Sequence, residues 1–221
     1  MHRGDKVIKR RPYYLDAIRL LFIMTTGGET PLKKIAGEDR VFSGNTRLYA
    51  YDFWMRYPDY LADELIERFD KTGDLDLLAK AEAIFVDEEP DLRRIPMIRF
   101  RFGAYERIDD ALAILTSRKL IGIGGRKTVD KVQETDFLVF PKAVKLCADI
   151  VAQEPVLEWY PKRAALVDLI ADGRPGSALK ARQYERIQYA STPLGAVIPS
   201  IDDEVRSRLE DRLKRPIAET A

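Results

Sequence analysis

Few residues in this chain could move protons or bind metal ions. Histidine and cysteine each occur once, as His2 and Cys147. A single histidine and a single cysteine cannot complete a tetrahedral zinc site. His2 also leaves no histidine further along the chain to act as the base in a serine–histidine or cysteine–histidine pair. Cys147 lies on the apolar side of a predicted helix, where a buried, unreactive thiol is expected. We therefore expect no enzymatic activity, no cofactor and no bound metal.

Asp52 is the carboxylate with the most unusual surroundings, because it lies in the aromatic segment NTRLYAYDFWMRY. We expect it to be half buried and paired with an arginine, for which Arg19, Arg47 and Arg56 are the candidates. Such pairs usually fix geometry, so Arg47 and Asp52 are predicted to have structural roles. The other grouped carboxylates have positions typical of helix first turns and solvated helix faces. They are Asp59, Asp63, Glu64, Asp109 and Asp110.

Basic residues gather in three segments, 3–11, 93–101 and 126–131. The whole chain has 37 basic and 36 acidic side chains, so any contact with DNA depends on local patches. We consider protein contact the better interpretation and keep phosphate contact open. The candidate partner or DNA contacts are Arg99, Arg101, Arg126, Lys127 and Lys131.

Composition indicates a globular, well-solvated chain of one domain or two small ones. Of its 221 residues, 46% are apolar and 33% are charged. One cysteine allows no internal disulfide, which fits a reducing, cytoplasmic setting. No apolar signal segment follows the basic N-terminus, and the longest apolar run, 20–24, is too short to span a bilayer. We expect no membrane association.

Hydrophobic spacing predicts a mainly α-helical fold with a small β-hairpin. A proline in the first turn and glycines after the last turn mark several helix ends. In the first half of the chain the expected helices are 13–26, a short 32–36 after Thr30-Pro31, 45–57, 58–69 and 75–85.

A winged-helix-like module is predicted over residues 93–153. The segment 95–105 fits a strand or a helix equally, and a helix follows that ends near Lys119. Apolar segments 120–123 and 136–140 then flank a charged tip, 124–135, which is too long for a tight turn and should form a flexible wing. A further helix over 141–153 completes the module.

The predicted organisation has five parts, ending in a tail helix with Val205, Leu209 and Leu213 on one side. That helix is charged on its other sides, so we expect it to be weak alone and better docked on a partner. The parts are a flexible basic N-terminus (1–12), an N-terminal helical region (13–92), the winged-helix-like module (93–153), C-terminal helices (154–190), and a linker with the tail helix (191–221).

Three segments together resemble one class of middle components of ABC-three-component systems. These are residues 11–26, 45–61 and 97–123; in the second, the matching positions are Arg47, Leu48, Asp52, Phe53, Tyr57 and Pro58. The resemblance implies a non-catalytic subunit of a bacterial, Lamassu-like anti-phage or anti-plasmid defence system. Such a subunit would bridge an SMC-like ATPase and an effector nuclease in a hetero-oligomer.

Two other functions stay open from the sequence. A winged helix with a basic wing is also typical of a DNA-binding regulator. An enzyme built on carboxylates and arginines, with Asp52 at its centre, is the least favoured interpretation.

Overall fold

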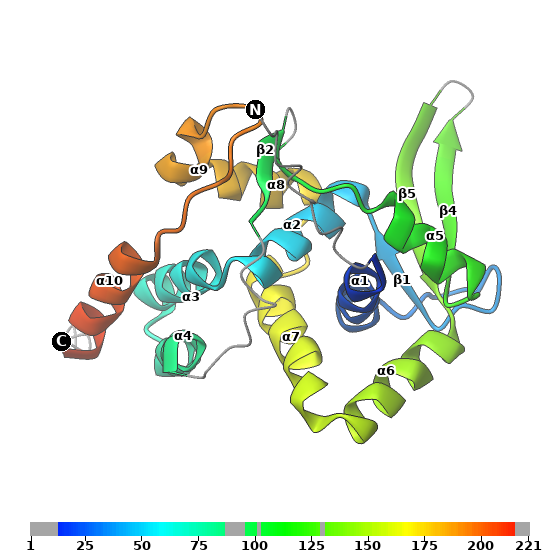
Figure 1. The fold of residues 1–221 in the computed structure, drawn as a ribbon, viewed down its shortest axis with the longest axis horizontal. Coiled ribbons are helices and arrows are strands. Elements are labelled where there is room, and N and C mark those ends of the chain that lie inside the picture. Colours follow the sequence, from blue (N-terminus) through cyan, green and yellow to red (C-terminus); the bar gives the residue numbers. More distant parts are fainter. Residues whose placement is uncertain (1–12, 87–95, 101–102, 129–130, 215–221) are drawn as a thin grey trace, which may run out of the picture.

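The computed structural model describes residues 13–86, 96–100, 103–128 and 131–214. The fold is mainly helical with a small antiparallel sheet, which confirms the predicted fold class at that level (Figure 1). The helices are α1 (Tyr13–Gly27), α2 (Asn45–Arg56), α3 (Pro58–Thr72), α4 (Leu75–Val86), α5 (Asp109–Ser117), α6 (Pro141–Gln153), α7 (Trp159–Ala171), α8 (Gly176–Tyr184), α9 (Ile187–Ser191) and α10 (Asp202–Lys214), with a 3-10 turn η2 at Pro155–Glu158. The strands are β1 (Arg40–Ser43), β2 (Ile98–Phe100), β3 (Gly103–Tyr105), β4 (Ile121–Thr128) and β5 (Lys131–Val139).

Helix α1 is surrounded by other helices. It contacts α2, α5, α6 and α7, and the run 20–24 on it is almost completely buried. A helix that is apolar on all sides is stable only when other elements surround it. The surrounding elements come from residues before and after position 93, so one buried apolar cluster joins the predicted parts of the chain.

Helices α2 and α3 follow each other with Tyr57 between them. Pro58 occupies the first turn of α3, where its missing N–H costs no hydrogen bond. Phe53 of α2 packs its ring against Tyr57 at 4.6 Å, Tyr60 at 5.0 Å and Tyr189 at 5.2 Å between ring centroids. This aromatic cluster joins α2 and α3 to the C-terminal helices.

The larger sheet has the strand order β1-β5-β4, with both pairs antiparallel. Strand β1 lies opposite residues 136–139 of β5, and β4 pairs along the full length of the β4–β5 hairpin. The predicted flexible tip is therefore wrong in extent, since residues 124–128 and 131–135 continue the two strands. Backbone pairing with the opposite strand outweighs the low strand propensity of the charged residues there.

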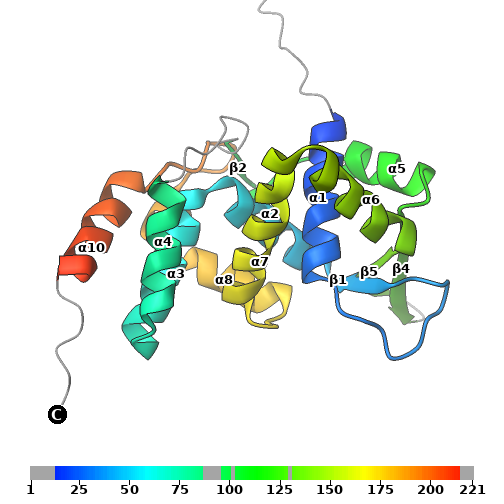
Figure 2. The same ribbon diagram turned by 90° about the horizontal axis from the view of Figure 1, so that it is seen from below.

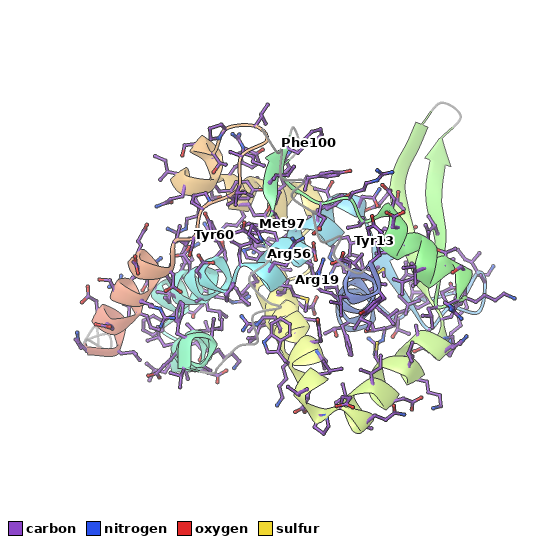
Figure 3. All side chains as sticks on the ribbon, in the orientation of Figure 1. Tyr13, Arg19, Arg56, Tyr60, Met97 and Phe100 are labelled. Atoms are coloured by element: carbon purple, nitrogen blue, oxygen red, sulfur yellow. The ribbon has the colours of Figure 1, made fainter. Side chains whose placement is uncertain are left out.

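Within the predicted strand-or-helix segment 95–105, the described residues 98–100 and 103–105 form the short strands β2 and β3. The predicted linker, 191–200, lies along β2: Arg99 N–H donates to Ala196 O at 2.8 Å, and Ile198 N–H donates to Met97 O at 3.0 Å. Met97 and Tyr60 lie beside this segment, and Tyr60 donates its hydroxyl to Pro199 O (Figure 3). Residues 191–200, called the strap below, therefore run across the molecule beside β2.

Helix α10 docks on its own chain. It lies against α3 and α4 and buries Val205 and Leu209, as its apolar spacing predicts. Arg208 and Arg212 both donate hydrogen bonds to Asp70 on α3. Leu213, which was predicted on the same side, is 42% exposed, so the chain itself covers the part of that face formed by Val205 and Leu209.

The short helix predicted at 32–36 is wrong, because these residues form an irregular loop between α1 and β1. The Glu38 carboxylate accepts hydrogen bonds from the N–H groups of Ile35 and Ala36 at 2.8 and 2.7 Å. These bonds satisfy the amides in a loop conformation, so the helix loses its advantage. The predicted flexible N-terminus, 1–12, lies outside the described residues.

Candidate functional site

Asp52 is completely buried in α2, deeper than the half-buried position predicted for it. Arg19 Nε donates to its Oδ1 at 2.5 Å, and Arg56 Nη1 donates to its Oδ2 at 3.2 Å. Arg19 and Arg56 come from α1 and α2, so the carboxylate joins the two helices where they meet (Figure 3). The predicted pairing of Asp52 with an arginine is confirmed for these two of the three candidates.

Two more carboxylates extend this buried charge network. Asp16 accepts a hydrogen bond from Arg19 at 2.8 Å, and Glu106, which precedes α5, pairs with Arg56. Burial lowers the pKa of Arg19, but Asp52 and Asp16 raise it more, so the net pKa lies above its ordinary value. The Arg19 guanidinium therefore stays charged and bound to carboxylates at physiological pH. The network is suited to fixing the packing of α1, α2 and the segment before α5.

Arg47 belongs to a different contact. Its Nη2 donates to the Tyr51 hydroxyl at 2.9 Å, and that hydroxyl donates to Asp168 on α7 at 2.7 Å. The Arg47 guanidinium also lies 4.7 Å from the centre of the Phe42 ring. Burial raises the pKa of Tyr51 well above its ordinary value, so the phenol keeps its proton. Arg47 is therefore placed where a structural residue is expected.

Arg99 is held by the strap. Its guanidinium donates to the carbonyl of Thr192 and lies 5.4 Å from the Tyr184 ring. This intramolecular contact occupies the side chain that we expected to meet a partner or DNA. Arg101 lies outside the described residues.

Arg126 and Lys127 lie in β4 and Lys131 lies in β5, near the end of the β4–β5 hairpin. Strand β1 reaches only Asp136, and one further backbone bond joins Gly44 N–H to Thr135 O at 2.8 Å. Beyond that point, in the described part of the chain, the two hairpin strands pair with each other alone. Figure 1 shows the hairpin extending away from the helices, so the three cations lie on a projecting feature.

Helix α5 lies beside the base of the hairpin and begins with two acids. They are Asp109 and Asp110, and the Asp109 side chain is 74% exposed. Its last turn has no basic residue, although Arg118 and Lys119 follow it directly. Arg107, whose side chain is 77% exposed, forms an ion pair with Asp109 at 3.7 Å, so basic side chains lie at both ends of α5.

Tyr105 in β3 lines two cavities. One, of about 370 Å³, is mostly apolar and includes Tyr49 and Phe100. The other, of about 410 Å³, has Asp16, Glu106 and Asp110 among its lining residues. Within the described ranges, no group of three or more histidine, cysteine or acidic side chains is arranged to hold a metal ion.

The sequence reasoning missed Glu106 and the Tyr51–Asp168 hydrogen bond. No signal in the sequence marks either, because each depends on residues brought together over a long chain separation. The Asp16–Arg19 pair did have a signal, since residues three apart on a helix are neighbours.

Comparison with protein families, with curated proteins and with solved structures finds no match to this chain. None of the helices in the described ranges has the length and apolar character needed to cross a membrane.

Proposed function

We propose that this chain is a non-catalytic adaptor subunit that bridges an SMC-like ATPase and an effector nuclease in an anti-phage or anti-plasmid defence complex. The observation that carries the proposal is the β4–β5 hairpin, which projects from a rigid helical body and has three cations near its end. Inside the body, arginine–carboxylate pairs join α1 to α2 through Arg19 and Asp52, and α3 to α8 through Glu64 and Arg182. A helical body held together in this way is suited to presenting a binding surface to partner proteins.

The order of the elements supports a winged-helix-like module that starts at α1, with wider bounds than the predicted 93–153. A winged helix has a strand between its first two helices and a hairpin after its third. Here β1 separates α1 from α2, the hairpin follows α5, and β1 pairs with the second hairpin strand. Helices α3 and α4 and the β2–β3 pair would then be an insertion between the second and third helices of the module.

Co-expression with the products of the neighbouring genes tests the adaptor proposal. A tag on this chain should recover the SMC-like ATPase and the effector together. Charge reversal at Arg126→Glu, Lys127→Glu and Lys131→Glu should weaken the recovery of one of them. The matched control reverses three cations on helices away from the hairpin: Lys71→Glu, Lys162→Glu and Lys214→Glu. Recovery of this chain as a lone monomer, with the ATPase present, contradicts the proposal.

DNA binding through the same hairpin is the second candidate, supported by the cations near its end. The two acids at the start of α5 oppose it in part, because the third helix of a winged helix usually enters the DNA groove, although Arg107 pairs with Asp109 there. A fluorescently labelled DNA duplex at low salt decides the question. Binding should weaken with salt, and removing the three cations should flatten that dependence by about 0.9 per lost phosphate contact. Absence of binding at low salt dismisses DNA contact by this chain alone.

A further inference from the structure

The loop between α1 and β1 is closed at its base. Glu29 and Val41 exchange two backbone hydrogen bonds, Glu29 N–H to Val41 O at 2.9 Å and Val41 N–H to Glu29 O at 2.8 Å. Residues 30–40 lie between these points and project beyond the sheet (Figure 2). We refer to residues 30–39 as the α1–β1 loop.

The α1–β1 loop is also held from within. Glu38 has no solvent-exposed surface, and its two carboxylate oxygens accept the N–H groups of Ile35 and Ala36. Lys34 forms an ion pair with Asp39 across the loop at 3.6 Å. A loop fixed at base and tip loses little conformational entropy when it binds, so its shape is ready for a partner.

Two apolar side chains point out of this fixed loop into solvent. The relative exposure of Leu32 is 109% and that of Ile35 is 85%, the two largest among the exposed large hydrophobic residues described. Single exposed hydrophobic residues are ordinary, but here the loop holds two of them three positions apart. Lys33 and Lys34 lie between them, so the tip combines apolar and basic groups.

We propose that the α1–β1 loop is a docking element, which inserts Leu32 and Ile35 into an apolar pocket edged by carboxylates on a partner protein. The apolar pair supplies the buried contact, and Lys33 matches an acid at the pocket rim, while Lys34 stays paired with Asp39. The inference rests on the proposed adaptor function and names a second contact surface, separate from the hairpin.

Charge at the base of the loop favours a protein over an anionic membrane. Glu29 is exposed beside the loop, and Asp39 already partners Lys34. These acids would face the headgroups, and two short apolar side chains give only weak membrane attachment without a second anchor. A protein pocket can place its acids opposite Lys33 alone.

The test uses the full chain and the purified SMC-like ATPase and effector from the neighbouring genes. Binding is titrated for the wild type, for the double variant Leu32→Asp/Ile35→Asp, and for a matched control, Leu75→Asp/Val156→Asp. The control replaces two exposed hydrophobic residues at the starts of α4 and η2, with exposures of 60% and 65%. We expect about 100-fold weaker binding to one partner for the loop variant and no change for the control.

A second variant, Glu38→Gln, leaves Leu32 and Ile35 in place and loosens the loop. It should weaken the same interaction several-fold, because part of the preorganisation is lost. If the wild type binds and the loop variant binds equally well, the docking role is overturned and the adaptor proposal stands. If the wild type binds neither partner, both proposals fall.

Two further outcomes also overturn the proposal. In one, the loop variant no longer binds vesicles of phosphatidylcholine and phosphatidylserine that the wild type binds, while its binding to both proteins is unchanged. The other is loss of self-association, measured by sedimentation of the chain alone, which would identify a second copy as the occupant.

Discussion

Replacing Asp52 with asparagine should strongly destabilise the fold. The substitution keeps the size of the side chain but removes the charge that two buried guanidiniums share. Breaking a buried ion pair from one side costs about 3–5 kcal/mol, because the remaining charge stays buried without its partner. Asp16 still neutralises part of the charge on Arg19, and Glu106 part of that on Arg56. We therefore expect the lower end, about 3 kcal/mol.

Urea denaturation of wild type and Asp52→Asn measures this cost directly, with an unchanged m-value as evidence that the transition is the same. For a chain of this length, about 3 kcal/mol corresponds to a fall in Tm of about 6–12 °C. Asp168→Asn is the control: its carboxylate also accepts a hydrogen bond, but its side chain is 44% exposed. We expect a cost of about 1 kcal/mol or less there.

Removing the whole network should recover much of the lost stability. The variant Asp16→Asn/Arg19→Met/Asp52→Leu/Arg56→Met/Glu106→Gln removes all five charges of the network, so none of them is left buried without its partner. A cost below about 1 kcal/mol for Asp52→Asn would refute the structural reasoning. Loss of cellular function with unchanged stability would instead return Asp52 to the role of a reacting group.

Two other groups give predictions about protonation. Burial raises the pKa of the Cys147 thiol to about 11. At pH 8 the native protein should therefore react with Ellman's reagent at least about 100-fold more slowly than the urea-unfolded chain. Similar rates for the two would contradict the burial of the thiol. Burial raises the pKa of Glu67, but hydrogen bonds from Arg182 and Lys71 lower it more, so its net pKa is about 2. This folded-state pKa is below the ordinary value, so the ionised Glu67 carboxylate stabilises the folded state. That contribution is full above about pH 5 and is lost as the pH falls through 2. Glu67→Gln should cost about 1 kcal/mol at pH 7, allowing for solvent screening, and almost nothing at pH 2; equal costs in denaturation at both pH values would contradict the assignment.

The helices of the N-terminal half were predictable because their signals are local. Predicted 13–26, 58–69 and 75–85 correspond to Tyr13–Gly27, Pro58–Thr72 and Leu75–Val86. Apolar spacing sets the buried face of each, and proline or glycine marks an end. The structure corrects these ends by one to three residues, which is where helices fray.

Elements that depend on distant residues were not predictable. Strand β1 has four residues, too few for a clear alternation, and it exists because β5 lies beside it. The loop at 32–36 looked helical because Thr30-Pro31 is a common start, but Glu38 and the Glu29–Val41 bridge decide its shape. The hairpin strands extend into charged sequence for the same reason.

The arginines considered as partners of Asp52 also divide into local contacts, which the sequence predicts, and distant ones, which it does not. Arg56 is four residues ahead on the same helix, and residues four apart share a face, so its contact was local. Arg47 is five residues behind and turns toward another face, where it meets Tyr51. Arg19 is 33 residues away, and only the packing of α1 on α2 selects it.

The two proposed contact surfaces lie at opposite ends of one sheet. The α1–β1 loop closes at Val41, which lies opposite Leu138 of β5, whereas the hairpin cations lie near Lys131 at the other end of that strand. Seven residue steps of about 3.3 Å separate Leu138 from Lys131, or about 23 Å. Backbone pairing of β4 with β5 along this length, with one register shift between Arg126 and Lys127, opposes a change in that separation. Two partners bound at these ends would therefore be held at a constant spacing, which an adaptor needs and a single docking patch cannot provide.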